Sequence, residues 1–330
     1  MTAGILICAE TTDGRVTTTT RELLHAGRKL SDRINRPLGA LLIGKDIAEA
    51  AREVISLGAD LAYTVDAPSF IESSPDYHTA IVAKACQEIG PCVVLFGQTD
   101  MGRDVAPSLA AKLGTTACMD CVNVDLDPDT KSLLQTRPIY GGNAMAVWTA
   151  EGLEPRIVAL RPRSVPAADP DVARQGEIVA LSPAVDESAA RIELIETRKE
   201  EIKGVKLEDA KIIVSGGGGI GGPEGFKVLE ELARIVGGAV AATRVPCDEG
   251  WVSSTIEVGQ TGSIVTPDLY IAVGISGAVQ HMVGCSNSKL IVAINRDPEA
   301  HIFQEANFGI VGDYKEAVPA LIERIRGLQR

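Results

Sequence analysis

The sequence VGQTGSIVTPDLYIAVGISGAVQHMVGCSNSKLIVAINRDP, residues 258–298, decides the fold of the second half of the chain. Residues 268–273 and 289–294 are short apolar runs rich in β-branched side chains, which is typical of buried parallel strands. Residues 277–283 between them have a helical pattern, with Ser276 as the expected N-cap. The stretch therefore predicts a strand, a turn, a helix and a second strand. Ligands bind at the carboxyl ends of the strands in such units, so we expect a nucleotide-type cofactor here.

Length and charge narrow the class of protein. A chain of 330 residues is long enough for about two domains, each with its own core. Hydrophobic residues make up 45% and charged residues 23%, which is an ordinary globular balance. The net charge of −12 argues against a nucleic acid or an anionic membrane surface as partner.

Three features of the sequence predict a cytoplasmic protein. Its first residues, MTAGILICAE, lack the basic start and the long apolar run of a signal peptide. No stretch approaches the roughly 20 apolar residues of a membrane span. The seven cysteines lack the spacing of a disulfide scaffold and indicate reduced thiols.

The first half alternates strand and helix signals and predicts a parallel α/β sheet. Strands are expected at residues 4–8, 38–44, 60–65 and 92–96, and helices at residues 20–34, 46–57, 78–89 and 104–113. Further strand-like runs follow without helices between them, which predicts an antiparallel or mixed extension; they span residues 121–125, 133–140, 144–149 and 156–160. An irregular connection then leads to a boundary that we place near residue 200, between domains 1–200 and 201–330.

The second half restarts the α/β pattern and predicts a doubly wound parallel sheet. Residues 211–214 form its first expected strand, and the glycine-rich run 215–222 and a helix at 223–236 follow. The next expected strand spans residues 239–243, and a loop with few regular signals leads into the stretch quoted above. A strand at 309–311 and an amphipathic helix at 315–329 end the chain.

Polar residues follow all five expected strands of the second half. The carboxyl ends of parallel strands lie along one edge of a sheet, so these residues are expected to line a single crevice. They are residues 215–222, Thr243, Arg244, Ser276, Gly277, Asn295 and Asp313. The glycine run contains two GxGxxG matches in a strand-to-helix context, but no carboxylate follows the next strand before Asp248, which disfavours an ordinary NAD site.

Two other motifs carry little functional weight by themselves. His281 is a lone histidine, which is more often structural than functional. Cys118 and Cys121 form a CxxC motif, but no second pair and no neighbouring histidine completes a zinc site. The motif also leads into a strand instead of starting a helix, which disfavours a thioredoxin-like role, and we predict no metal site.

Longer motifs carry a family resemblance. The sequences VGQTG (258–262), DLYIAVGISGAVQH (268–281) and INRDPE (294–299) resemble the FAD-binding signature of electron transfer flavoprotein α subunits. In the first half, GQTDMGRDVAP (97–107) and RPIYGGN (137–143) resemble the N-terminal domain of the same family. The resemblance therefore extends over nearly the whole chain.

The resemblance implies a heterodimer with a β subunit. Residues 1–200 would be the β-subunit-like domain that contacts the partner, and residues 201–330 would bind FAD. The complex would be an electron carrier and not an enzyme by itself, passing electrons between dehydrogenases, of acyl-CoA type in fatty acid β-oxidation, and an acceptor such as a quinone oxidoreductase. Carried over by position, the FAD contacts are Thr243, Arg244, Val258, Gly259, Gln260, Thr261, Ser276, Gly277, Ala278, Val279, Gln280, His281, Asn295, Asp313 and Tyr314.

Two of these positions have roles implied by the family. The arginine that matches Arg244 lies over the flavin near N5, where a cation favours the anionic reduced forms. The histidine that matches His281 reaches the pyrimidine edge of the ring. One departure stands beside them: family members commonly have Ser-Gly-Gly-Arg-Gly after the first strand of this domain, and Gly218 takes the place of that arginine. The redox type is therefore an open question.

Two alternatives remain at this level. The first is the α subunit of a flavin-bifurcating complex that oxidises NADH. This chain alone does not discriminate between such a complex and a simple carrier, because the site that decides lies in the β subunit. A nucleotide-binding regulatory protein with a degenerate site is the second alternative, although Arg244, Gln260, Thr261 and His281 are all in place.

Overall fold

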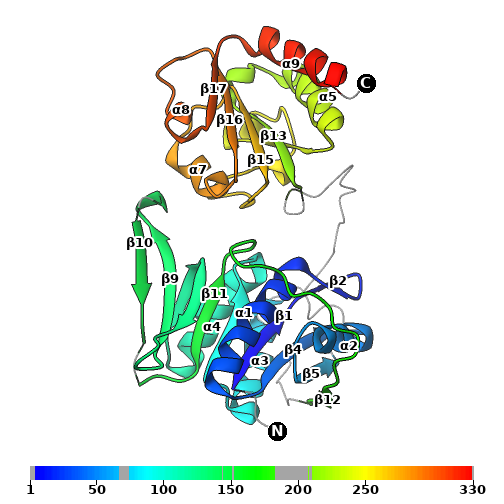
Figure 1. The fold of residues 1–330 in the computed structure, drawn as a ribbon, viewed down its shortest axis with the longest axis vertical. Coiled ribbons are helices and arrows are strands. Elements are labelled where there is room, and N and C mark those ends of the chain that lie inside the picture. Colours follow the sequence, from blue (N-terminus) through cyan, green and yellow to red (C-terminus); the bar gives the residue numbers. More distant parts are fainter. Residues whose placement is uncertain are drawn as a thin grey trace. The chain divides into compact units, whose positions relative to one another are not determined.

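The computed structural model describes residues 4–66, 74–142, 144–150, 152–182, 207 and 210–328. The chain divides into two compact units, Met1–Arg198 and Lys199–Arg330 (Figure 1). The domain boundary that we expect near residue 200 lies outside the described residues. No described helix combines the length and the apolar character that crossing a membrane requires.

The first unit is built on a sheet of seven strands in which every neighbouring pair is parallel. The order across the sheet is β12-β5-β4-β1-β6-β11-β7. In chain order these strands are β1 (Ile5–Ala9), β4 (Leu38–Gly44), β5 (Leu61–Asp66), β6 (Val93–Gly97), β7 (Ala117–Cys121), β11 (Arg156–Leu160) and β12 (Glu177–Ala180). The central strands β4, β1, β6 and β11 are buried on both faces, as parallel strands covered by helices require, whereas the edge strand β12 is largely exposed.

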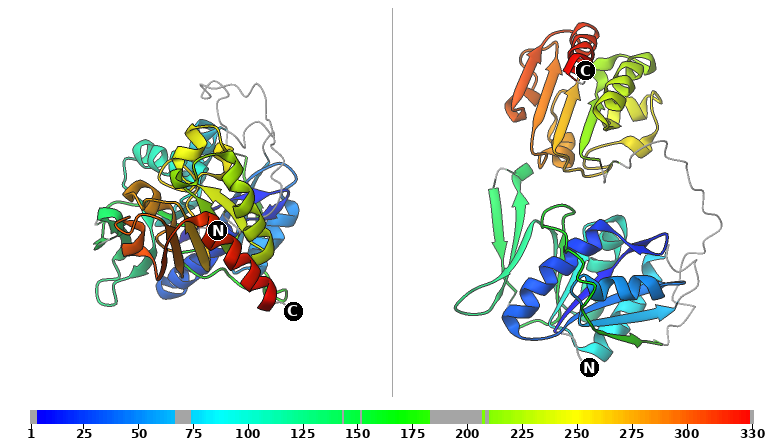
Figure 2. Two further views of the ribbon diagram at one scale, coloured as in Figure 1. Left: turned by 90° about the horizontal axis from the view of Figure 1, so that it is seen from above. Right: turned by 45° about the vertical axis from the view of Figure 1, so that its right-hand side comes forward.

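Four helices cover this sheet, two on each face (Figures 1 and 2). α1 (Thr18–Ile34) and α2 (Ala48–Ser56) pack Leu23 and Val54 into one core. α3 (Pro75–Ile89) and α4 (Asp100–Leu113) pack Ile81 and Leu109 into the other. The predicted helix at 104–113 begins four residues earlier, because the Thr99 side chain caps it by accepting a hydrogen bond from the Gly102 N–H at 3.1 Å.

The strands after α4 divide between two sheets. β8 (Asn123–Leu126), β9 (Leu133–Ile139) and β10 (Ala144–Trp148) form an antiparallel sheet of their own, in the order β10-β9-β8, with the short helix η2 (Tyr140–Gly142) between β9 and β10. β7 and β11 instead join the parallel sheet. The strand predicted at 121–125 is therefore wrong in its bounds: Cys121 ends β7, and β8 begins at Asn123. A small hairpin of β2 (Thr11–Thr12) and β3 (Arg15–Val16) was not predicted, because strands of two residues leave no apolar period to detect.

The second unit is a five-stranded parallel sheet in the order β14-β13-β15-β16-β17, which confirms the predicted doubly wound fold. Its strands are β13 (Ile212–Gly216), β14 (Ala239–Ala242), β15 (Leu269–Val273), β16 (Ile291–Asn295) and β17 (Phe308–Val311). α5 (Phe226–Val236) and α9 (Tyr314–Leu328) cover one face, and α7 (Val279–Cys285) and α8 (Ile302–Glu305) cover the other (Figure 1). The strand order reverses between β13 and β15, which is the switch point where such sheets bind ligands.

Two local predictions in the second unit were wrong. α7 begins at Val279, its N-cap is Ala278, and no side chain caps it, so Ser276 is not the cap. The reason is Gly277, whose φ of +83° turns the chain before the helix and whose backbone lies against Ile302. The expected irregular loop after β14 also contains order, with α6 (Arg244–Asp248) and the short helix η7 (Ser254–Ile256).

Candidate functional site

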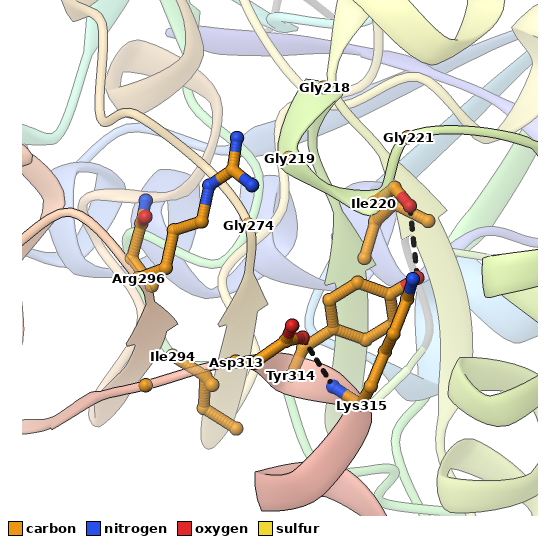
Figure 3. A pocket seen from close by; sticks show the side chains of 12 residues that line it. Gly218, Gly219, Ile220, Gly221, Gly274, Ile294, Arg296, Asp313, Tyr314 and Lys315 are labelled. Carbon is orange, nitrogen blue, oxygen red and sulfur yellow. Dashed lines mark hydrogen bonds between the residues drawn. The ribbon is translucent and has the colours of Figure 1, made fainter.

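A cavity of about 190 Å³ opens at the carboxyl edge of the second sheet (Figure 3). Four segments line it: residues 218–221 after β13, Gly274 after β15, residues 294–296 at the end of β16, and residues 312–315 after β17. These segments are distant in sequence, and the parallel order of the strands brings them to one edge. The predicted meeting of strand ends therefore exists for Asn295, Asp313 and the glycine run.

The glycine run forms the wall of this cavity because its backbone approaches the neighbouring turn very closely. The Gly217 and Gly219 N–H groups donate to the carbonyl oxygens of Val273 and Gly274, both at 2.9 Å. A Cβ at Gly217 would lie 2.4 Å from the Gly274 oxygen, and one at Gly219 would lie 2.8 Å from it, so only glycine fits. Gly221 has a φ of +78°, and a Cβ placed there would have no atom within 4 Å, so the space beside this end of the glycine run is open.

The polar side chains of the cavity are partly used to fix its walls. The Asn295 side-chain N–H donates to the Ile275 carbonyl at 2.8 Å, which ties β16 to the turn after β15. One Asp313 carboxylate oxygen accepts from the Lys315 N–H at 2.9 Å. The buried Tyr314 hydroxyl donates to the Ile220 carbonyl at 2.9 Å and so holds the glycine run against α9 (Figure 3). Tyr314 thus acts on the cavity through its wall.

Sequence reasoning missed two cations of this cavity, Arg296 and Lys315. Both are exposed; in the close view the Arg296 guanidinium points toward Gly219 and Gly274, and the Lys315 side chain runs beside Tyr314 (Figure 3). Two cations and one carboxylate line the cavity, so its net charge is positive although the net charge of the whole chain is −12. Each cation lies within two residues of a predicted site residue, Asn295 or Asp313. Both would have been found if the search for polar residues after each strand had continued two positions further along the chain.

A second group of predicted residues meets where the loop 258–261 lies against α7. The Gln260 N–H donates to the Gln280 carbonyl at 2.8 Å, and the His281 Nδ1 donates to the Val258 carbonyl at 2.8 Å. Gly259, with φ of +153°, passes so close to Gly284 that a Cβ there would lie 2.5 Å from the Gly259 nitrogen. The loop and the helix are therefore one rigid structure on the α7 face of the sheet.

Among these residues, His281 is enclosed by the protein. Only 7% of it is exposed, its Nδ1–H is held by Val258, and its Nε2 accepts from the Tyr270 hydroxyl at 3.1 Å. Burial lowers the pKa of His281, which keeps the ring neutral at pH 7. In this arrangement His281 supports the loop 258–261 and does not line the cavity.

Most of the remaining predicted residues lie on the surface around these two groups, whereas Thr243 and Gly277 are buried. Ser276, Ala278, Val279 and Gln280 are exposed at the start of α7, and Thr261 donates to the Glu257 carboxylate at 2.5 Å. Arg244 is 65% exposed at the start of α6, where it pairs with Asp248 at 3.0 Å and does not line the cavity. Thr243 is buried beside it, and its N–H donates to the Gly216 carbonyl at 3.0 Å.

Within the described part of the chain, no three His, Cys, Asp or Glu side chains are grouped to hold a metal ion. The polar side chains along this sheet edge, which are two cations, a carboxylate and an amide, have the character of a nucleotide site.

Comparison with known proteins identifies the family. Residues 5–186 match the model of the electron transfer flavoprotein domain, and residues 206–286 match that of the electron transfer flavoprotein FAD-binding domain. The chain is 42% identical to the electron transfer flavoprotein subunit alpha of Thermoanaerobacterium thermosaccharolyticum and 40% identical to that of Bacillus subtilis, over 98% of both chains in each case. It is 33% identical to the lactate dehydrogenase (NAD(+),ferredoxin) subunit LctC of Acetobacterium woodii, over 98% of this chain and 77% of that subunit. The chain therefore belongs to the family of electron transfer flavoprotein α subunits, whose C-terminal domain binds FAD.

Proposed function

We propose that this chain is the FAD-carrying subunit of a heterodimer that passes electrons from dehydrogenases to a downstream acceptor, and that FAD lies across the carboxyl edge of the second sheet. The observation that carries the proposal is the cavity at the β13–β15 switch point, with its glycine backbone, Arg296, Lys315 and Asp313. The chain is then a carrier and not an enzyme by itself.

The residues present fit an FAD. The Cβ directions of Gly221 and Gly312 meet no atom within 4 Å, so the wall leaves room where side chains would stand in another protein. The volume of about 190 Å³ is smaller than the roughly 300–1,000 Å³ of pockets that enclose a whole small ligand. The cavity therefore suits one end of a dinucleotide, and the residues of the sheet edge toward α7 would hold the other end.

The cavity side chains would hold the nucleotide end. Asp313 and Asn295 suit ribose hydroxyls or adenine, since a carboxylate and an amide accept and donate hydrogen bonds to these groups. Arg296 and Lys315 suit the diphosphate, because both are cations that line the cavity. The flavin end would meet the loop 258–261, residues 276–281, Thr243 and Arg244.

When bound, FAD supplies a redox group that takes up and releases electrons one or two at a time. The task of the protein is to set its potential, and Arg244 is the residue proposed for it. Its pair with Asp248 is exposed, and such pairs contribute only about 0–1 kcal/mol, so the guanidinium is released at little cost. A cation beside the ring favours negative charge on it and raises the reduction potential.

The experiment that tests this role is Arg244→Ala in the heterodimer. We expect FAD to stay bound and its potential to fall by about 20–65 mV in a spectroelectrochemical titration, which corresponds to about 1–3 kcal/mol for a two-electron couple. Arg326→Ala is the matched control, because Arg326 is a similarly exposed arginine that pairs with Glu231 at 2.7 Å, on the α5–α9 face. Equal potentials in the Arg244 variant and the wild type would remove Arg244 from the flavin.

The partner proposed for the first unit is the β subunit. The antiparallel sheet carries exposed large apolar side chains on its edge strand β10, namely Met145, Val147 and Trp148, and Tyr140 beside them is 82% exposed. Apolar surface of this kind is typical of an interface. Co-expression with the adjoining partner gene should give a yellow heterodimer, and a colourless one without flavin would favour the regulatory alternative. Acyl-CoA dehydrogenases and a quinone oxidoreductase are the proposed donor and acceptor.

A bifurcating complex is the second candidate, favoured by the similarity to the LctC subunit of a lactate dehydrogenase named for NAD(+) and ferredoxin. Anaerobic titration with NADH, counted per flavin, separates the two. Two flavins per heterodimer and rapid reduction by NADH would support bifurcation, whereas one flavin that NADH leaves oxidised would support the simple carrier.

All seven cysteines are free thiols, which supports a reducing compartment such as the cytoplasm.

A further inference from the structure

The CxxC motif of β7 lies on a β-bulge. Against β11, Cys118 is opposite Val158, and Cys121 is opposite Leu160. Three residue steps on β7 therefore correspond to two on β11, and the extra residue is accommodated where Asp120 adopts a φ of +61°. The bulge changes which side chains of the motif can meet.

In a regular strand the two cysteines would be separated. Residues i and i+3 point to opposite faces and lie about 10 Å apart along the strand. The extra residue restores the same face: Cys118 and Cys121 both pack against the core of α1 and α2, while Ala117 and Met119 pack against the opposite core. The two sulfur atoms lie 3.4 Å apart as a result.

Hydrogen bonds of Asp120 and Arg161 hold the bulge in this form. The Asp120 N–H donates to the Gln98 side-chain oxygen at 3.0 Å, and the Asp120 carboxylate accepts two hydrogen bonds from Arg161, at 2.8 and 2.7 Å. The Arg161 side chain is only 6% exposed, and its own N–H donates to the Cys121 carbonyl at 2.7 Å. The sulfurs are therefore brought together by the fold and not by chance rotamers.

The two thiols differ in access and in acidity. Cys118 is half-buried and reachable, whereas Cys121 is buried. The Cys121 S–H donates to Cys118, and this hydrogen bond, assisted by the charge of Arg137, lowers the pKa of Cys118; the same bond raises the pKa of Cys121. The Arg137 Nε is buried and has no hydrogen-bond partner within the described chain. The Cys118 thiol is thus suited to act as the nucleophile, and the Cys121 thiol is suited to form a disulfide with it afterwards.

We propose that Cys118 and Cys121 form a reversible dithiol–disulfide site that reacts with hydroperoxides. With hydrogen peroxide, the Cys118 thiolate attacks one peroxide oxygen, the O–O bond breaks, and the second oxygen takes up a proton and leaves as water; an organic hydroperoxide would release its alcohol instead. The Cys118 sulfenic acid that results is attacked by the Cys121 sulfur, which forms the S–S bond and releases a second water. In total, two thiols lose two electrons and two protons, and one hydroperoxide is reduced.

The geometry allows the product with a small displacement. The sulfur atoms must approach from 3.4 Å to about 2.05 Å. A dithiol such as dithiothreitol reverses the change by thiol–disulfide exchange at the more accessible sulfur, that of Cys118. Burial raises the pKa values of the Cys8, Cys86 and Cys285 thiols, so they are less reactive than the Cys118 thiol.

The test uses the reduced heterodimer under anaerobic conditions, with hydrogen peroxide in small excess. Free thiols of this chain are counted after denaturation, and the peptide that holds both cysteines is examined by mass spectrometry. We expect the count to fall from seven to five, with an internal Cys118–Cys121 bond that dithiothreitol reverses. A count that stays at seven, or a loss at other cysteines with a linear Cys118–Cys121 peptide, would overturn the proposal.

Variants assign the two roles. Cys121→Ser should stop at the sulfenic acid of Cys118, which dimedone labels, and Cys118→Ser should lose at least tenfold in the rate of oxidation at this peptide. Arg137→Gln should slow the first step about threefold. Without the charge of Arg137 the pKa of Cys118 lies nearer its ordinary value, and the loss in thiolate fraction outweighs the gain in nucleophilicity of the thiolate. Arg137→Lys keeps the charge and should keep the rate. Oxidation of Cys118→Ser at the wild-type rate would refute the order of attack. The wild-type thiol count decides the proposal even where a variant fails to fold.

Discussion

Neighbouring glycines of the cavity wall should respond in opposite ways to a single added methyl group. Gly217 and Gly218 are adjacent in the run that follows β13. A Cβ at Gly217 would meet backbone, at 2.4 Å from the Gly274 oxygen and 2.8 Å from the Ile275 Cα. A Cβ at Gly218 would meet only the Val245 side chain, its Cγ1 at 3.4 Å and its Cβ at 3.9 Å, which is ordinary contact.

The magnitudes follow from these contacts. In Gly217→Ala the two turns must part by about 1 Å to reach normal separation, at an overpacking cost of about 1–3 kcal/mol. Weakening of the hydrogen bond from the Gly217 N–H to Val273 adds about 1 kcal/mol. Gly218→Ala should instead gain about 0.4–1 kcal/mol, because its φ lies outside the left-handed region and the unfolded chain loses freedom. The two variants should differ by about 3 kcal/mol, more than a hundredfold in the unfolding equilibrium.

The assay is urea unfolding of the heterodimer at a fixed excess of FAD, followed by the fluorescence of the released flavin. Flavin retained through gel filtration gives a second measure, since the Gly217–Gly274 contact forms the cavity wall. Gly219→Ala is an additional control and should resemble Gly217→Ala, because its Cβ would lie 2.8 Å from the Gly274 oxygen. Equal stability and equal flavin retention in all three variants would refute the assignment of the run as a close-packed wall.

Two further predictions concern single side chains. Tyr314→Phe should lower the stability of the second unit by about 1–2 kcal/mol and weaken FAD retention, because the Ile220 carbonyl loses its buried hydrogen-bond donor. Urea unfolding measures this loss. The control is Tyr140→Phe, at a tyrosine that is 82% exposed, and it should leave the stability of the second unit unchanged. Burial raises the pKa of Glu22 to about 7, against 4.5 in the unfolded chain, so the folded state binds the additional proton between these values and its stability falls as pH rises from about 4.5 to 7. Glu22→Gln keeps an acceptor for the Arg163 N–H and should remove this fall, with stability near wild type at pH 4.5 and higher at pH 8; a parallel pH dependence in both proteins would contradict the prediction.

Much of the fold could be read from local patterns. Buried parallel strands are continuous apolar runs, and β4 and β15 show how closely such runs give their own bounds. The strand-end rule also located Asn295 and Asp313, because parallel pairing forces the carboxyl ends onto one edge whatever the connecting loops do.

The side chains around the site were less predictable. The Tyr270 hydroxyl holds His281 across the core, and Tyr314 uses its hydroxyl on a carbonyl 94 residues away. Contacts of this kind depend on which face each residue occupies and on how two strands align, and neither is encoded in the spacing of a motif. Gly277 shows the same limit, because only the position of Ile302 explains why the helix begins after it.

The sequence by itself determined the alternation of strands and helices, the doubly wound class of the second unit and the positions of its strand ends, since apolar period and glycine placement are local properties. Tertiary structure alone decided that His281 supports a loop, that Arg296 and Lys315 line the cavity, and that Cys118 and Cys121 meet. Sequence reasoning disfavoured chemistry at this motif, because no second pair or histidine accompanies it and it leads into a strand; in a regular strand its two sulfurs would point to opposite faces. A single extra residue in β7, fixed by Arg161 and Gln98, puts them on one face, and register against a neighbouring strand is a property that only the folded chain possesses.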